Sequence, residues 1–181
     1  ALLEKCLASL HTHTRDVTFE VIVVDNASLD KSVAMARQNF PGARVIGLDE
    51  NRGFAAANNV AIKQSSGKYI LLLNPDTELT ENSLKKVFDK METDASIGVF
   101  GCMLLNSDGT MQPSVRRFPR LRDIITIFFK LYKLFPFLLD RYMAKGFDYT
   151  REQEVDQVMG AFFCIRAQRR AEQLARDEAA R

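Results

Sequence analysis

The chain has 181 residues, of which 46% are hydrophobic and 27% are charged, and its formal net charge is +2. This length and composition predict one globular domain with a sizeable core and leave too little chain for two. So small a net charge does not suggest a nucleic acid partner, and we expect none. Three cysteines lie far apart with no CxxC pair, which indicates reduced thiols in a cytoplasmic protein rather than a disulfide framework.

The chain opens without methionine, directly in a helical pattern over residues 1–12. We interpret this opening as that of an excised fragment, with a first strand expected upstream of it. No apolar run reaches the roughly 18 residues that a membrane span requires. The nearest candidate, 124–139, is interrupted by Lys130 and Lys133.

Strand and helix patterns alternate through the first hundred residues. We expect helices at 1–12, about 30–39, 55–64 and 80–92, and strands at 19–24, 43–48, 69–73 and 99–105, before a hairpin turn at 106–109. Ser28 or Asp30 would cap the second helix and Thr80 the fourth, with Asn82 or Ser83 as weaker starts, and Ser65-Ser66-Gly67 would close the third. Such alternation predicts an α/β fold in which helices flank a mostly parallel sheet.

The strongest local signal is the apolar run 69–73, which ends abruptly in Asn74-Pro75-Asp76. Proline cannot donate to a sheet, so the strand must stop there and leave an amide and a carboxylate at its carboxyl edge. Ligands bind at this edge in open α/β sheets, and oxygen donors suit a Mg²⁺ or Mn²⁺ ion that holds phosphates. A plain turn followed by a helix cap would use the same residues for local reasons. Both interpretations stay open on spacing alone.

Two further polar segments are expected at the same edge. Asp25 and Asn26 end the strand 19–24, and Asn51-Arg52-Gly53 opens a helix, where backbone N–H groups favour phosphate. Arg52 would pair with phosphate or serve simply as a solvated loop charge. No G-x-G-x-x-G and no P-loop motif is present, which argues against a dinucleotide oxidoreductase or a P-loop enzyme.

The sequence changes character after residue 113. Four arginines between 116 and 122 form a basic cluster, the apolar helical run 124–139 follows, and a strand is expected over 155–165 around Gly160. One interpretation is a solvated basic face beside a core helix. The other is an interfacial helix, because cationic side chains that flank Phe and Leu attract anionic lipid headgroups.

Four segments in order now resemble glycosyltransferase family 2, with most similarity to bacterial rhamnosyltransferase-like members. The resemblance covers roughly residues 1–166 and rests on Val23-Val-Asp-Asn-Ala-Ser-Leu-Asp30, Asn51-Arg-Gly-Phe-Ala-Ala-Ala-Asn-Asn59, Gly67-Lys-Tyr-Ile-Leu-Leu-Leu-Asn-Pro-Asp-Thr77 and Val155-Asp-Gln-Val-Met-Gly-Ala161. It implies a GT-A fold and inverting transfer of a sugar, with rhamnose as the guess, from a nucleotide diphosphate donor. The acceptor would be a saccharide or a lipid-linked saccharide.

The resemblance also implies roles for single residues. Asp25, with Asn26 beside it, matches the acidic residue that contacts the donor base. Asn74 and Asp76 match the ends of the family's Asp-x-Asp element, so Asp76 would coordinate the divalent cation, Mn²⁺ or Mg²⁺, and Asn74 would lie near the ribose. Asn in place of the first Asp removes one charge and weakens the expected metal affinity. Two further matches complete the donor site: Arg52 and Gly53 where a helix approaches the donor, and Gly160 in the floor of the cleft.

The chain departs from the family pattern at both ends. Family members begin with a strand that helps to hold the nucleotide, and this chain starts after it. Beyond Arg166 the family continues to a Glu-Asp pair that supplies the general base, whereas this chain has an atypical tail over 167–181. Asp177 and Glu178 lie in an Ala/Arg-rich setting that does not match, so we identify no general base and expect the chain to bind donor weakly without turnover.

We therefore expect a nucleotide-sugar-binding subdomain over 1–112, an acceptor-side segment over 113–166 with an apolar helix at 124–139, and the tail. Residues 116–139 would make a peripheral contact with the inner membrane face. Two alternatives remain. A nucleotidyltransferase would need a Gly-rich basic phosphate loop that is not seen. A non-catalytic nucleotide-binding or interaction module would use the helix 124–139 as its docking surface.

Overall fold

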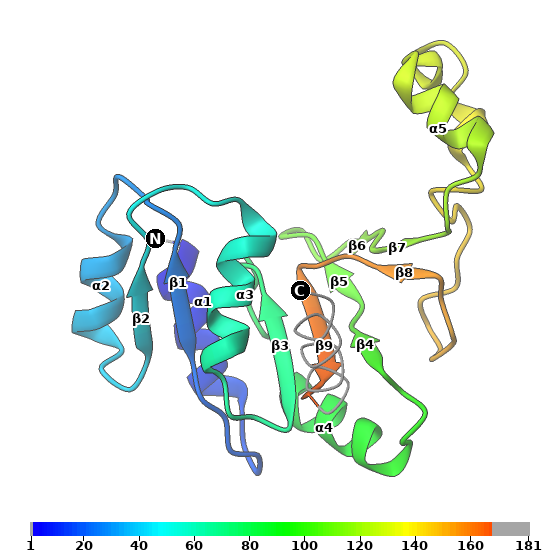
Figure 1. The fold of residues 1–181 in the computed structure, drawn as a ribbon. Coiled ribbons are helices and arrows are strands. Elements are labelled where there is room, and N and C mark those ends of the chain that lie inside the picture. The colour runs from blue at the N-terminus through cyan, green and yellow to red at the C-terminus, as the bar shows by residue number, and fades with distance from the viewer. Residues whose placement is uncertain (1, 168–181) are drawn as a thin grey trace, which may run out of the picture. The chain divides into compact units, whose positions relative to one another are not determined.

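The computed structural model describes residues 2–167, and the chain divides into two compact units. The first unit comprises residues up to 100 and from 161 onward, and the second comprises 101–160. The helices and strands, drawn in Figure 1, are α1 (Leu2–His13), β1 (Ile22–Asp25), α2 (Ser32–Asn39), β2 (Arg44–Gly47), α3 (Phe54–Gln64), β3 (Tyr69–Leu73), α4 (Ser83–Thr93), β4 (Val99–Gly101), β5 (Leu104–Leu105), β6 (Met111–Gln112), β7 (Val115–Arg116), α5 (Leu121–Phe128), η1 (Leu131–Lys133), η2 (Pro136–Leu139), β8 (Gln157–Val158) and β9 (Phe162–Arg166).

The core of the first unit forms where the amphipathic faces of the helices meet the strands. α1 buries Cys6, Leu7 and Leu10 on one face, as the helical spacing predicts. Leu7 and Leu10 pack with Ala36 of α2 and with Leu79, and partly buried side chains from β1, β2 and β3 surround this cluster. Helix packing against the strands thus holds α1 and α2 beside β1, β2 and β3.

The strands pair in a pattern that the sequence only partly predicts. β1 and β2 are parallel, with Asp25 opposite Gly47. β3 is antiparallel to β9, with Leu73 opposite Phe162, and β9 lies between β3 and β4. The α/β class is therefore confirmed, but the described sheets are less parallel than expected. The difference arises because β9 follows the second unit and enters the sheet from a distant part of the sequence, which local patterns do not reveal.

Several predicted element ends are wrong. Asn82, rather than Thr80, precedes α4, and its side chain binds the backbone of Arg15 instead of the helix. α3 ends at Gln64 and is closed by Ser65, within the expected Ser65-Ser66-Gly67 segment, but in an extended rather than a left-handed conformation. Lys31 occupies the cap position of α2, so Asp30 lies one residue before the position expected for it. Its carboxylate accepts a hydrogen bond from the N–H of Ser32.

Two of the expected strands are divided. The segment 99–105 forms β4 and β5, and the segment 155–165 forms β8 and β9 on either side of a turn at Gly160. β8 pairs with β7 in the second unit, while β9 pairs with β3 in the first. An added Cβ at Gly101 would lie 2.9 Å from Cγ1 of Val158, so a side chain there requires a shift.

The second unit contains short elements. Asn106 and Gly109, whose φ is +82°, close the predicted hairpin between β5 and β6. The single helix expected over 124–139 is wrong: α5 ends at Phe128, Lys130 is left-handed, and η2 begins with Pro136. A left-handed residue and a proline each break an α-helix. Within residues 2–167, no helix combines the length and apolar character needed to cross a membrane.

Arg166, at the end of β9, connects three elements of the first unit. Its guanidinium donates to the carbonyl of Met91 (2.6 Å) in the last turn of α4, and to those of Asp94 (3.1 Å) and Ile97 (3.3 Å) just beyond the helix. It also donates to the hydroxyl of Tyr69 at 2.9 Å and lies 5.1 Å from the centre of that ring. Met91 itself is fully buried. One side chain therefore ties the end of α4 to β3 and β9.

Candidate functional site

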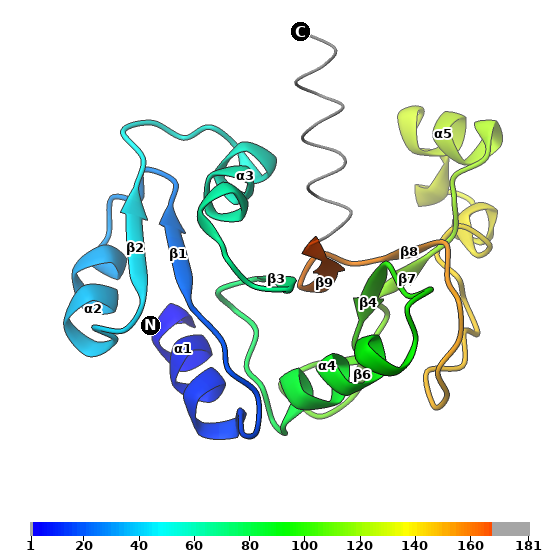
Figure 2. The ribbon, with the colours of Figure 1, turned by 60° about the horizontal axis from the view of Figure 1, so that its bottom comes forward.

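A groove of about 910 Å³ runs between β1 and β3 in the first unit. Residues of both strands line it, α1 contributes Leu3, Cys6 and Leu7, and α3, which packs beside β1 (Figure 2), contributes Phe54 and Ala57. Among the described strands β1 pairs only with β2 and β3 only with β9, so each has one edge without a strand partner. Side chains of β1 and β3 give the groove a mainly apolar middle, and charged residues such as Glu20 and Lys68 line it before the amino ends of these strands. At their carboxyl ends the polar lining includes Asp25, Asn26 and Asn74.

Asn26 joins the end of β1 to the loop before α3. Its Nδ2 donates to Oδ1 of Asn51 at 2.8 Å, and its Oδ1 accepts from the backbone N–H of Arg52 at 2.8 Å. Oδ1 of Asn51 also accepts from the N–H of Gly53 at 2.9 Å. The sequence motif contains Asn51 but predicts no role for its side chain, and its place in a loop between a strand and a helix is the only local signal of one. The Asn26–Asn51 pair holds the two segments together.

Asp25, Arg52 and Gly53 occupy distinct settings around that pair. The Asp25 carboxylate accepts from the N–H of Ser28 at 3.2 Å, which shapes the turn after β1. Gly53 has φ +78°, a conformation that a residue with a Cβ rarely adopts. The Arg52 guanidinium lies 3.5 Å from a Glu50 carboxylate oxygen, with nearly half of its side-chain surface exposed. Arg52 and Gly53 do not line the groove.

The turn after β3 is built as the proline predicts. The N–H of Asn74 donates to the carbonyl of Ala161 at 3.0 Å, and the Asn74 carbonyl accepts from the N–H of Thr77 at 3.1 Å. Asn74 is half-buried, whereas Asp76 is exposed and lies outside the groove lining. The structure thus brings Asn74 to the groove with Asp25 and Asn26, and it presents Asp76 on the solvent side of the same turn. Gly160 is the last residue of the second unit and precedes Ala161.

The oxygen donors of this turn fit only one kind of metal site. Within the described part of the chain, no three His, Cys, Asp or Glu side chains gather closely enough to hold an ion. One carboxylate and one amide cannot form a complete cage, but they suit a Mg²⁺ or Mn²⁺ ion that keeps waters and takes its other ligands from phosphates. The turn is therefore compatible with a cation that binds together with a phosphorylated ligand.

Cys6 lies beneath this turn, and the negative charge of the turn affects the pKa of its thiol. Its Sγ donates to the carbonyl of Asn74 at 3.7 Å. Burial, together with the carboxylates of Asp76 and Glu78, raises the pKa of Cys6 to about 11, and burial alone raises the pKa of Cys164 to about 11. Both folded pKa values lie above the ordinary 9.0, so the folded state keeps these thiols neutral at pH values where the unfolded state ionises them. The stability that the neutral thiols allow is therefore complete below pH 9.0 and is lost as the pH rises through about 11.

We therefore expect Cys6 and Cys164 to resist alkylation in the native protein. At about pH 8 only ~0.1% of a thiol with this pKa is thiolate, the reactive form, and burial adds steric protection. Mass spectrometry after brief iodoacetamide treatment should find both residues unmodified, and both labelled after denaturation in guanidinium. Rapid labelling of native Cys6 would contradict its placement beneath the turn.

The comparisons with known proteins agree with one another. The family model described as Glycosyl transferase family 2 matches residues 1–170. The O-antigen biosynthesis protein RfbC of Myxococcus xanthus is 33% identical over 113 residues, which cover 61% of this chain and 9% of that protein. The N-acetylglucosaminyl-diphospho-decaprenol L-rhamnosyltransferase of Mycobacterium tuberculosis is 28% identical over 130 residues, 66% of this chain and 42% of that protein.

Among solved structures, S. aureus TarS 1-349 in complex with UDP superposes with a TM-score of 0.51 at 26% identity. The match covers 62% of this chain and 35% of that one. A second crystal structure of S. aureus TarS gives a TM-score of 0.54 at 24% identity, covering 65% of this chain and 22% of that one. The chain spans less than half the length of each of these relatives.

Proposed function

Because the chain belongs to glycosyl transferase family 2 and has its GT-A fold, we propose that it forms part of the donor site of an inverting sugar transferase. The donor would be a nucleotide diphosphate sugar. The observation that carries the proposal is the meeting of Asp25, Asn26 and Asn74 at the polar end of one groove. The UDP complex of S. aureus TarS supports a nucleoside diphosphate as the ligand class. The named rhamnosyltransferase relative supports rhamnose as the sugar to test first.

Each residue then has a definite task. Asp25 accepts a hydrogen bond from the donor base, and the Asn26–Asn51 pair keeps the loop before α3 next to it. Asn74 lies near the ribose. Arg52 leaves its exposed Glu50 partner and pairs with phosphate, because a surface ion pair contributes little free energy and is easily broken. Gly53 lets the loop backbone turn into α3, and Gly160 floors the sugar cleft.

Asp76 would hold the divalent cation, Mn²⁺ or Mg²⁺, with Asn74 as its neighbour. When bound, the cation neutralises the diphosphate leaving group, which lowers the barrier to transfer. Exposure of Asp76 suits this task, since the carboxylate can reach a cation that arrives already bound to the nucleotide. Among residues 2–167 we assign none to the general base. Asp177 and Glu178, which we do not assign to it either, lie outside the described residues.

The remaining segments receive roles in the same proposal. Residues 1–112 bind the nucleotide sugar, and 113–166 face a saccharide or lipid-linked acceptor, while the tail 167–181 lies almost wholly outside the described residues. The protein works in the cytoplasm, and residues 116–139 make a peripheral contact with the inner membrane face. The family membership does not favour the alternative, a non-catalytic interaction module.

Thermal unfolding with dTDP, UDP and GDP, each with Mn²⁺, Mg²⁺ or a chelator, tests this function. We expect one nucleotide to raise the midpoint only when metal is present, because a ligand that binds the native state alone stabilises it by mass action. The nucleotide that does so identifies the donor base. Stabilisation that is equal with metal and with chelator would contradict the role of Asp76. Partner binding without any nucleotide effect would favour the interaction module.

A further inference from the structure

α5 in the second unit has its polar and apolar faces reversed relative to an ordinary surface helix. Its buried residues are Asp123 and Thr126, whose exposures are 0% and 5%. Its large apolar side chains face outward, including Leu121 (73% exposed) and Phe128 (77% exposed). A helix on the surface of a soluble domain normally turns its apolar stripe inward. The outward stripe of α5 therefore needs a cover from outside the unit.

The apolar surface continues beyond α5 and lies within a strongly basic segment. Leu134, just before η2, is 76% exposed, and Phe137, within η2, is 65% exposed. Between positions 116 and 145 eight residues are basic and two are acidic, a formal net charge of +6 in a chain whose total is only +2. Exposed aromatic and aliphatic side chains flanked by excess positive charge complement an anionic lipid surface, since the bilayer offers apolar depth and negative headgroups together.

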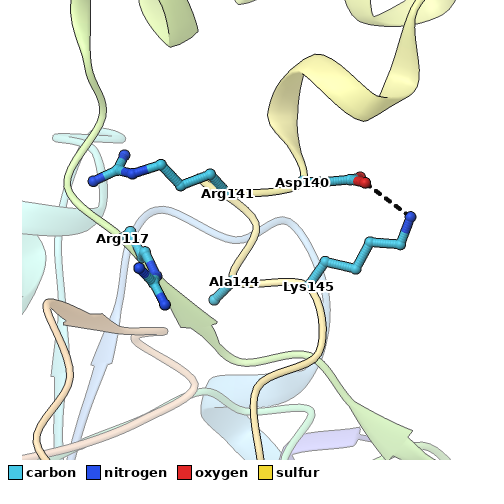
Figure 3. A pocket seen from close by; sticks show the side chains of 5 residues that line it. All are labelled: Arg117, Asp140, Arg141, Ala144 and Lys145. Atoms are coloured by element: carbon cyan, nitrogen blue, oxygen red, sulfur yellow. Dashed lines mark hydrogen bonds and ion pairs between the residues drawn. The ribbon is translucent and has the colours of Figure 1, made fainter.

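A shallow pocket of about 340 Å³ lies in the same segment and is lined by Arg117, Asp140, Arg141, Ala144 and Lys145. Figure 3 shows the two arginines on one side of Ala144, and Lys145 with Asp140 on the other. Lys145 donates to Asp140 at 3.0 Å, but both side chains are substantially exposed, so this pair can be shared with a phosphate at little cost.

Buried Asp123 orients one of these arginines. Its Oδ2 accepts from the backbone N–H of Arg120 at 2.8 Å and lies 3.6 Å from the Arg141 guanidinium, which also donates to the Phe118 carbonyl at 3.2 Å. An arginine has five N–H donors, so these contacts fix the guanidinium and still leave donors for a phosphate oxygen. The inverted helix and the basic pocket are thus coupled through one buried carboxylate.

We propose that the second unit docks on anionic phospholipid bilayers, with the outward side chains of α5 and η2 inserted and a lipid phosphate held by Arg117, Arg141 and Lys145. The short helices lie in the interface rather than cross it. This proposal deepens the peripheral contact proposed above for 116–139 and rests on it, but it does not depend on sugar transfer. Its tests contain no nucleotide, so the two proposals can fail separately.

Insertion is tested with a tryptophan reporter, because the chain contains no tryptophan. Phe128→Trp places one in the proposed apolar surface, and Phe54→Trp, at a side chain 63% exposed in the first unit, is the matched control. With phosphatidylglycerol vesicles that contain brominated phospholipid, we expect quenching and a blue shift for F128W and neither for F54W. Equal responses from both reporters, or none from F128W, would overturn the insertion and leave the apolar face to a protein partner.

The phosphate pocket is tested by vesicle sedimentation. Arg117→Gln with Lys145→Gln should weaken binding to phosphatidylglycerol vesicles by about tenfold or more. Arg37→Gln with Lys63→Gln removes the same charge from exposed positions of the first unit and should change binding less than about twofold. Arg117→Lys with Lys145→Arg keeps the charge and should retain most affinity. Equal losses in the two neutralised variants, or equal wild-type binding to pure phosphatidylcholine, would overturn the pocket.

Discussion

Asp76→Ala is expected to remove the metal-dependent part of nucleotide binding, so that Mn²⁺ no longer strengthens it. The carboxylate is exposed at the turn after β3, and it is the one charged oxygen donor that the turn itself supplies. Without it, a cation bound to the diphosphate keeps only the amide of Asn74 and water. Isothermal titration with nucleotide, in the presence of Mn²⁺ and in the presence of a chelator, measures the binding.

Glu78→Ala provides the matched control for that variant. Glu78 is also exposed, lies two residues further along the same segment, and raises the pKa of Cys6 as Asp76 does. Glu78 forms an ion pair with Lys5 at 3.9 Å, and this exposed contact contributes little to stability. E78A should therefore bind nucleotide and metal as the parent does. Equal losses in D76A and E78A would mean that general negative potential, rather than a ligand at position 76, supports binding.

Arg166→Ala should reduce the free energy of unfolding by roughly 3 kcal/mol, because it removes several charge-assisted hydrogen bonds together and leaves partly buried carbonyls without donors. The loss includes the bonds to Met91 and Asp94, which cover the end of α4, and the bond to the Tyr69 hydroxyl. Urea denaturation followed by circular dichroism measures the change. Nucleotide binding should weaken too, since β9 leads directly from Ala161, whose carbonyl holds Asn74.

Two further variants separate geometry from charge at this position. Arg166→Lys keeps the charge but lacks the planar fork, so it should be intermediate. Arg151→Ala removes an arginine whose partner, Asp148, lies 3.2 Å away on the surface, and it should leave the denaturation midpoint unchanged. If R166K matched the parent, charge alone would account for the effect and the fork of hydrogen bonds would carry no stability.

Local sequence signals predict the first unit well where a residue fixes its own conformation. β3 begins and ends as expected because Pro75 stops an apolar run, and α1 and α3 follow from helical spacing. Asp25, Asn26 and Asn74 line one groove, as expected for residues at the carboxyl ends of strands, although β1 and β3 belong to different sheets among the described strands.

Features that depend on distant partners are not predictable in this way. Arg166 contacts Tyr69, 97 positions earlier, and Asn26 binds Asn51, 25 positions later. Neither pair has a local pattern, and the antiparallel entry of β9 beside β3 has none either. The prediction for 124–139 is wrong for another reason. The apolar side chains of this run predict one core helix, but Lys130 and Pro136 interrupt the helix. Its apolar side chains also face outward rather than into a core.

β1 and β3 line one groove and, among the described strands, each has a single partner. The backbone groups on their other edges can hydrogen-bond to any extended chain that reaches them. In dilute solution the groove is a place for a small ligand. In concentrated solution the same edges would offer neighbouring molecules a template for strand pairing, so we expect self-association to rise with protein concentration.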